Sequence, residues 1–251
     1  MHNQQRDYIK DGLILHLDGI DNTRHGFDEN TSVWEDLSPM QNDANLYNIH
    51  TSYGYYSVEE KGYVFLHNNA YAKTINNIGL SGFADHTVEI VAKPYSVADG
   101  STVFNGYLWF GDRFASEGMT RIFGYNRGTA GRHGVVVAYL NTMVTYDLYP
   151  EIEMTHSVSF RTNKHGTIQA GMKDPYILSY NGEYREGVAT GKTYSDRLLN
   201  SPVEIGRYWQ YNNENRTFYG SIQSVRIYDR VLTDEEVLHN YRVDKRRFGI
   251  T

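Results

Sequence analysis

Cysteine is absent from the sequence of 251 residues, which excludes both a disulfide framework and a thiolate zinc site. Long hydrophobic runs are absent too, since none approaches the roughly 20 residues that a membrane span requires. The N-terminal residues 1–7 are polar and lack the apolar core of a secretory signal peptide. We therefore expect no membrane insertion, and we expect export from the cell to use another route, such as release within an assembled particle.

Positive charge is also scarce. The chain carries 24 Lys and Arg residues against 30 Asp and Glu residues, giving a net charge of -6. Its one dense basic run extends from Lys245 to Arg247, and we expect this run to be a solvated helix end that complements the helix dipole. Because no basic stretch is broad enough to follow a phosphate backbone, the composition argues against a nucleic-acid partner.

Aromatic residues, by contrast, are abundant, with 22 Tyr, 10 Phe and 3 Trp. Tyrosine is favoured in half-buried β-strands. It also presents a flat apolar face with a polar tip, which suits contact surfaces. Two interpretations are therefore open for each tyrosine: it fills a β core, or it recognises a ligand or partner at the surface.

Short segments with a period of two recur along the chain. Leu13, Leu15 and Leu17, for example, share one face of a predicted strand. Roughly 12 to 14 such strands are separated by turn residues, with no helical pattern between them and no linker or repeat. The sequence thus predicts an all-β fold, a two-sheet antiparallel jelly-roll sandwich. We expect one domain over residues 1–251, with a short N-terminal arm over 1–10.

Two further signals concern the path of single strands. The pair Asn181-Gly182 predicts a tight hairpin turn. In the last predicted strand, residues 218–228, Ile222 is out of phase with the apolar residues that follow it. One extra residue near Gln223-Ser224 would explain the shift, so we expect a β-bulge there.

A short C-terminal helix is predicted over residues 233–243. Thr233 and Glu236 have the spacing of a capping box, and Leu232 and Val237 have that of a hydrophobic staple. We expect this helix to dock on the sandwich as a lid. Its predicted apolar face comprises Val237, Leu238 and Tyr241.

Motifs at both ends of the chain carry a family resemblance. Residues 218–237 contain an aromatic residue, a Gly-x-Ile step, an Arg-Ile-Tyr strand and a Leu-Thr-x-x-Glu helix start. Residues 12–19 and the Trp-x-Asp-Leu-Ser turn in 34–39 form an N-terminal pair of motifs. Together they resemble the laminin-G-like jelly-roll domains of the concanavalin A-like lectin/glucanase fold.

The resemblance implies that the two chain ends lie side by side as paired strands. It leaves the ligand open, because residues 95–200 match only in the rhythm of their strands and this region normally carries the specificity loops. The tail over 240–249 is similar to that of laminin-G-like domains in gut-bacterial surface proteins and phage structural proteins. It therefore implies a location outside the cell or on a virion surface.

The resemblance also implies a calcium site near the paired terminal strands, with Ca²⁺ as the one candidate cofactor. Hard oxygen ligands suit this ion, and the candidates here are Asp18, Asp21, Asn22, Asp36 and Asp229. The same residues also fit an ordinary structural interpretation, in which Asp and Asn form and cap turns.

A glycan site would combine aromatic rings, on which sugar C–H groups stack, with polar groups that bind hydroxyls. Two clusters have this composition. The first comprises Tyr107, Trp109, Asp112 and Arg113, and the second comprises Arg207, Tyr208, Trp209, Tyr211 and Asn212. Alternatively, Trp109 belongs to the core and the remaining residues are solvated loop positions.

The sequence predicts no catalytic residues. Glycoside hydrolysis needs two carboxyl groups about 5 to 9.5 Å apart, but Glu151 and Glu153 follow a proline in a predicted loop. Glu183 and Glu186 flank a turn and read as a solvated hairpin tip. No Gly-x-Ser-x-Gly elbow or His-x-x-x-His metal pair occurs, so we expect a protein that is not an enzyme.

Three functional hypotheses follow. The leading one is a non-catalytic carbohydrate-binding or adhesion module that recognises surface glycans as part of a phage or cell surface. The second is a virion decoration or structural protein acting through contacts with other subunits, including copies of itself. The third is a polysaccharide hydrolase or lyase.

Overall fold

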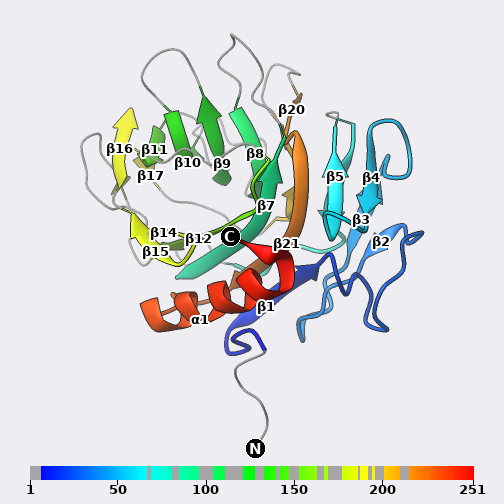
Figure 1. The fold of residues 1–251 in the computed structure, drawn as a ribbon. Coiled ribbons are helices and arrows are strands. Elements are labelled where there is room, and N and C mark those ends of the chain that lie inside the picture. The colour runs from blue at the N-terminus through cyan, green and yellow to red at the C-terminus, as the bar shows by residue number, and fades with distance from the viewer. Residues whose placement is uncertain are drawn as a thin grey trace, which may run out of the picture.

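The structure is a computed structural model in which two antiparallel sheets pack face to face (Figure 1). Every strand pairing in the described part of the chain is antiparallel, which confirms the predicted two-sheet sandwich. The described residues are 7–66, 69–80, 85–95, 104–110, 121–127, 133–139, 142–146, 153–162, 167–168, 177–185, 187–191, 194–195, 201–209 and 215–251.

The first sheet has eight strands in the described residues. Two of them, β1 and β5, pair with different parts of the same side of β21. Its strands, in spatial order, are β15 (Glu183–Arg185), β14 (Ile177–Tyr180), β12 (His156–Thr162), β7 (His86–Pro94), β21 (Gly220–Tyr228), β5 (Gly62–Phe65) and β4 (Gly54–Ser57), with β1 (Leu13–Asp18) beside β21.

The second sheet has nine strands over the same described ranges. In spatial order they are β16 (Gly187–Gly191), β11 (Thr142–Tyr146), β10 (His133–Tyr139), β9 (Arg121–Arg127), β8 (Phe104–Phe110), β18 (Glu204–Ile205), β6 (Tyr71–Thr74), β3 (Ala44–Tyr47) and β2 (Val33–Trp34). Two small ribbons pair β13 (Thr167–Ile168) with β17 (Tyr194–Ser195), and β19 (Arg207–Trp209) with β20 (Asn215–Thr217).

The structure divides the described chain into 21 strands, more than the predicted number. Several of them span only two or three residues, which is too short for a period of two to be recognised in a sequence. The sandwich class was therefore predicted correctly, whereas its division into strands was not.

One apolar core lies between the sheets. Leu15 and Leu17 of β1 are fully buried there, as their alternation predicts. Trp34 contributes from the second sheet and donates its indole N–H to the carbonyl of Asp18 at 2.9 Å. Ile222, Val225 and Ile227 of β21 belong to the same cluster, so residues from both chain ends close one core.

Strand β21 occupies a central position in the first sheet. It pairs with β7 on one side and with both β1 and β5 on the other. Its register shifts between Ile222 and Ser224, which confirms the predicted bulge. The pairing of β1 with β21 likewise confirms that the chain ends are adjacent strands.

The predicted hairpin at Asn181 and Gly182 is also confirmed. Both residues adopt a positive φ, 48° and 77°, as a two-residue hairpin turn with a matching twist requires. A Cβ atom on Gly182 would lie 2.6 Å from the ring of Tyr241. Glycine at this position therefore permits the positive φ of the turn and also the close packing of Tyr241 of the C-terminal helix.

Helix α1 (Asp234–Asp244) lies over the outer face of the first sheet (Figure 1). The capping box between Thr233 and Glu236 is formed in both directions. Leu232 and Val237 are buried in one cluster, as the staple predicts. The lid prediction is confirmed, and the helix continues as a π-helical turn, η1 (Lys245–Gly249).

The prediction of a purely solvated basic end is wrong for one of its residues. Arg247 turns back to the sheet, where its Nη2 donates to both carboxylate oxygens of Asp18 at 2.9 Å. The carboxylates of Asp18 and Asp21 attract this guanidinium, and only the folded chain brings them near it.

No helix in the described ranges combines the length and the apolarity that crossing a membrane requires.

The buried face of α1 is polar as well as apolar, which the sequence did not reveal. Asp244 accepts two hydrogen bonds from Arg226 of β21, at 2.9 and 2.7 Å. Arg226 also donates to Glu89 of β7 at 2.9 Å, and Asn240 of α1 donates to the same carboxylate at 2.8 Å. Burial opposes the charge on Arg226, but Asp244 and Glu89 raise its pKa well above the usual value. We call Arg226, Glu89, Asp244 and Asn240 the lid network.

Removing one charged residue from the lid network is expected to destabilise the fold, because a buried charge is left without its ion-pair partner. We predict that Asp244→Ala lowers the free energy of unfolding by about 3 to 5 kcal/mol. The control Glu183→Ala breaks an exposed pair with Arg185 and should cost about 0 to 1 kcal/mol. Urea unfolding followed by tryptophan fluorescence measures both, and equal losses in the two variants would contradict the prediction.

Candidate functional site

A group of flat side chains, of which Tyr47 is exposed, lies on the outer face of the second sheet. Ala72 and Thr74 of β6 are buried, so the alternating residues Tyr71 and Lys73 face away from the core. Tyr47 of β3 stands directly opposite Tyr71 in the register. Their rings stack with centroids 4.4 Å apart and an angle of 8° between the planes.

Arg207 completes this group from the start of β19. Its guanidinium carbon lies 3.1 Å from the ring centroid of Tyr71, so three flat groups are layered in the order Tyr47, Tyr71, Arg207. Tyr47 is 38% exposed at the end of the series. We call these three residues the tyrosine stack.

Backbone geometry at Gly206 directs Arg207 to this position. Gly206 adopts a φ of 81°, and a Cβ atom there would lie 2.6 Å from the ring of Phe65. Its N–H donates to the carbonyl of Tyr107 at 2.8 Å, and its carbonyl accepts from Phe218 at 3.0 Å. The chain therefore turns sharply between β18 and β19, and only glycine fits the turn.

A buried carboxylate anchors the cations beside the stack. Arg207 Nε donates to Glu204 Oε2 at 2.8 Å, and Lys73 Nζ lies 3.2 Å from Glu204 Oε1. Burial raises the pKa of Tyr71, while Arg207 acts in the opposite direction. The site thus offers a ring face, a neutral phenol and an ammonium group, with one net positive charge.

The structure places the residues of the second predicted cluster as follows. Arg207 belongs to the tyrosine stack. Tyr208 and Trp209 lie in β19, with their backbones opposite Arg216 and Asn215 of β20. Tyr211 and Asn212 fall outside the described residues.

In the first predicted cluster, the structure describes the side chain of Tyr107 and the backbone of Trp109. Tyr107 is fully buried, and its hydroxyl lies 2.7 Å from His156 Nε2, so its ring is not exposed for stacking on a sugar. The backbone of Trp109 stands opposite Glu204 in the register of β8 and β18. Asp112 and Arg113 fall outside the described residues.

Sequence reasoning missed Tyr47, Tyr71, Lys73 and Glu204. A weak signal existed, since Tyr71 and Lys73 alternate with two small residues in the pattern of a half-buried strand. The pairing of β6 with β18 joins segments more than a hundred residues apart, and local patterns carry no information about it.

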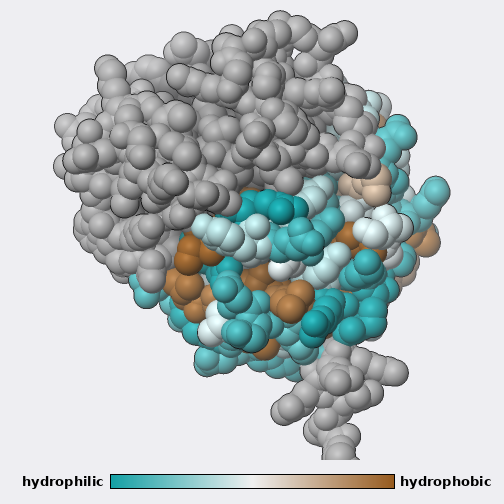
Figure 2. All heavy atoms as spheres, turned by 60° about the vertical axis from the view of Figure 1, so that its left-hand side comes forward, coloured by the Kyte–Doolittle hydropathy of each residue, from teal (hydrophilic) through white to brown (hydrophobic). Residues whose placement is uncertain are grey.

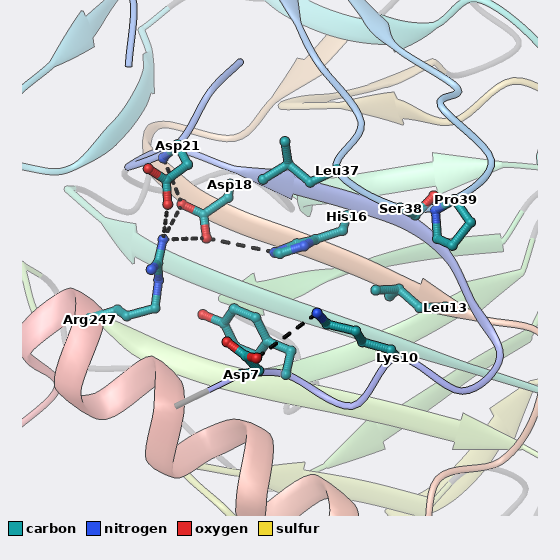
Figure 3. A pocket seen from close by; sticks show the side chains of 11 residues that line it. Asp7, Lys10, Leu13, His16, Asp18, Asp21, Leu37, Ser38, Pro39 and Arg247 are labelled. Carbon is teal, nitrogen blue, oxygen red and sulfur yellow. Dashed lines mark hydrogen bonds and ion pairs between the residues drawn. The ribbon is translucent and has the colours of Figure 1, made fainter. Parts of the chain in front are cut away.

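Two of the candidate calcium ligands, Asp18 and Asp21, line a pocket of about 480 Å³ (Figure 3), whereas Asn22, Asp36 and Asp229 are not among its lining residues. Asp18 and Asp21 point toward Arg247, whose Nη2 lies 3.0 Å from Asp21 Oδ2 (Figure 3). Burial would raise the pKa of Asp18, but His16 and Arg247 outweigh it and hold the pKa well below its usual range. The pocket is lined by Asp7, Tyr8, Lys10, Leu13, His16, Asp18, Asp21, Leu37, Ser38, Pro39 and Arg247.

These residues do not fit a calcium ion. Asp18 Oδ1 already accepts from Arg247 and from the N–H groups of Ile20 and Asp21, whereas Ca²⁺ needs six to eight oxygen ligands. Asp36 binds backbone N–H groups of its own turn, including that of Asn42 at 2.7 Å. Among the described residues, no group of three or more His, Cys, Asp or Glu side chains is placed to hold a metal ion.

Comparison with known proteins identifies the family. A laminin-G family model, described as concanavalin A-like lectin/glucanases superfamily, matches residues 66–238, more than half of the chain. The chain belongs to this superfamily. A comparison with curated proteins found no match.

Solved structures with the same fold are similar to this chain at low sequence identity. Domain 4 of AbnA, a GH43 extracellular arabinanase from Geobacillus stearothermophilus solved with arabinotriose, has a TM-score of 0.60 and 15% identity, covering 92% of this chain and 98% of that one. The binding domain of Paraclostridial Mosquitocidal Protein 1 has a TM-score of 0.57 and 14% identity, covering 92% and 52%.

A Trypanosoma rangeli sialidase is similar too, with a TM-score of 0.59 and 14% identity over 96% of this chain. Because the match covers only 34% of the sialidase chain, the likeness concerns one part of that protein. Two of these neighbours, the arabinanase and the sialidase, are named as enzymes of carbohydrate, and the likeness to them concerns the fold.

The buried His156 gives the protein a measurable pH dependence. Burial lowers its pKa from 6.5 to about 4, so the folded state resists a proton that the unfolded state accepts. Stability from this group is present above pH 6.5 and falls as the pH drops toward 4, by about 3 kcal/mol in total. We predict that His156→Gln flattens this part of the pH profile in urea unfolding, and His25→Gln, at an exposed position, is the matched histidine substitution for comparison.

The calcium geometry leads to a second prediction. A site with a Kd one-hundredth of the free calcium concentration would stabilise the fold by about 2.7 kcal/mol. We expect no such shift when Ca²⁺ replaces EDTA, because Arg247 occupies the position opposite Asp18 and Asp21. Differential scanning calorimetry measures the Tm in both buffers, and a rise of several degrees with calcium would refute this interpretation of the pocket.

Proposed function

We propose that this protein is a non-catalytic carbohydrate-binding module whose glycan contacts the tyrosine stack. The observation that carries the proposal is the layered arrangement of Tyr47, Tyr71 and Arg207 on an exposed sheet face. Sugar rings pack their C–H groups on such faces, and stacking on a rigid ring costs little side-chain entropy.

Polar groups beside the stack suit sugar hydroxyls. Lys73 is partly exposed and donates, while Glu204 holds Lys73 and Arg207 in position. The backbone of Trp109 stands opposite Glu204, and the backbone of Trp209 ends β19, so both predicted tryptophans belong to strands that border this surface. Preorganised donors next to a flat ring give orientation as well as contact area.

The carboxylates support a binding role rather than catalysis. The buried ones in the described ranges each have a partner: Asp18 binds Arg247, Asp36 binds its turn, Glu204 binds Arg207, and Glu89 and Asp244 bind Arg226. Burial raises the pKa of Glu89, as a general acid would need, but α1 covers this residue. Substrate would have no access to it.

The neighbouring structures favour an oligosaccharide ligand. One of them was solved with arabinotriose and another is called a binding domain. We therefore propose a surface glycan as the partner, bound outside a cell or at a virion surface. An arabino-oligosaccharide is the first probe to test.

A role as a structural subunit is the second candidate, since several tyrosines are exposed. On the face seen in Figure 2, however, apolar residues of the described part form small groups among hydrophilic ones. Stable subunit interfaces have a more continuous apolar centre. This observation favours glycan binding over subunit contacts for that face.

A glycan array tests the proposal, with arabinotriose, sialyllactose and plant-polysaccharide oligosaccharides among its probes. We predict that Tyr47→Ala, which removes the exposed ring at the end of the stack, and Trp209→Ala each weaken binding at least about tenfold, since one lost aromatic contact is worth roughly 1 to 3 kcal/mol. Tyr184→Ala, at an exposed position on β15 of the other sheet, should bind like the wild type.

Binding to none of these probes would refute the glycan proposal. Release of reducing ends from any polysaccharide would refute the non-catalytic part of it. Mass photometry of the same samples would show assembly into larger particles, the outcome that the structural role requires.

A further inference from the structure

A second group of exposed tyrosines lies on the outer face of the first sheet. Tyr55 of β4 is 42% exposed, and Tyr219, directly before β21, is 39% exposed. Tyr95 follows the end of β7 and is partly buried. We call Tyr55, Tyr95 and Tyr219 the tyrosine patch.

Strand register brings the three residues together from distant parts of the chain. Val64 of β5 stands opposite both Tyr55 and Ser221, so the side chain of Tyr55 is directed to the outer face together with that of Ser221. The N–H of Tyr95 donates to the carbonyl of Tyr219 at 3.0 Å, and the two rings meet edge to face with centroids 6.3 Å apart.

An ion pair lies among these rings. Lys93 Nζ is 2.8 Å from Glu60 Oε1, and it lies 5.8 Å from the ring centroid of Tyr95. Ser221 Oγ donates to Glu60 Oε2 at 3.4 Å. Burial and the Glu60 carboxylate raise the pKa of Tyr95, so its hydroxyl stays neutral in solution.

The patch repeats the composition of the tyrosine stack on the opposite layer of the sandwich. Each surface combines tyrosine rings with one lysine–glutamate pair, Lys93 with Glu60 here and Lys73 with Glu204 there. Helix α1 covers a different part of the same face, where it binds Arg226 and Glu89. The patch therefore lies on a part of this face that the lid leaves open.

We propose that the tyrosine patch is a second glycan-binding site, so that one protein molecule holds two carbohydrate chains at once. This inference rests on the proposed function of the tyrosine stack. The two sites lie on outer faces separated by the core, so one short oligosaccharide cannot contact both. A long polysaccharide, or two chains, can.

The chemistry of the patch favours a neutral sugar. Lys93 and Glu60 cancel in charge, and together they offer donors and an acceptor for hydroxyl groups. Tyr55 and Tyr219 supply exposed ring faces for the C–H groups. Two weak sites of this kind would gain avidity on a polysaccharide without any additional contact.

A bridging assay tests the inference. Plates are coated with arabinan, xylan, galactan or mannan, the protein is bound and washed, and biotinylated polysaccharide of the same kind is then captured. We expect the wild type to capture it. The double variant Tyr55→Ala/Tyr219→Ala and the single variant Tyr47→Ala should each still bind the coated plate but capture at least about tenfold less.

Tyr184→Ala is the matched control, because it removes an exposed tyrosine at the far end of the same sheet. It should bridge like the wild type. Unchanged Tm values show that the variants are folded, and mass photometry shows whether the protein is monomeric.

The outcomes separate the two proposals. Plate binding without bridging, or bridging that survives Tyr55→Ala/Tyr219→Ala, overturns the second site and leaves the first intact. Absence of plate binding on every polysaccharide overturns both. A wild-type dimer that the double variant dissolves also overturns the second site, because a second copy of the chain would then occupy the patch.

Discussion

The guanidinium of Arg226 is buried between the first sheet and the C-terminal helix, and the arrangement of both chain ends depends on it. A charge at this depth is tolerated only when it is paired, and Asp244 and Glu89 pair it from α1 and β7. The N-terminal arm joins the same site, since the hydroxyl of Tyr8 donates to Asp244 at 2.9 Å. The docked helix therefore supplies the partner that Arg226 of β21 needs in order to be buried. Strand β21 in turn pairs with β1, the first strand of the chain.

The position of the lid also decides which surfaces remain for recognition. α1 and η1 cover one part of the first sheet, where Val91 packs against Phe248. The part around Tyr55 and Tyr219 stays exposed, and so does the stack on the second sheet. Exposed tyrosines beside lysine–glutamate pairs thus lie on both layers, and the proposed binding of extended sugar chains rests on this distribution.

Much less of the candidate site than of the fold could be predicted from the sequence. Arg207 was predicted as a ligand-binding residue, but its neighbours Tyr47 and Tyr71 were not, because the register of β3, β6 and β18 joins remote segments. Tyr107 had the composition of a site residue and is buried instead, since a tyrosine in an alternating strand fits either face equally well. The acidic residues near β1 suggested a metal, whereas Arg247 supplies the positive charge.

The sequence by itself determined the features that arise within a few residues: the alternation in β1, the bulge near Ser224, the hairpin at Asn181 and the capping box at Thr233. Each follows from local dihedral preferences and side-chain periodicity, which neighbouring residues suffice to express. Tertiary structure alone decided the lid network, the tyrosine stack and the tyrosine patch. Their members are far apart along the chain, and they meet only because sheet register and burial favour one arrangement of charges and rings.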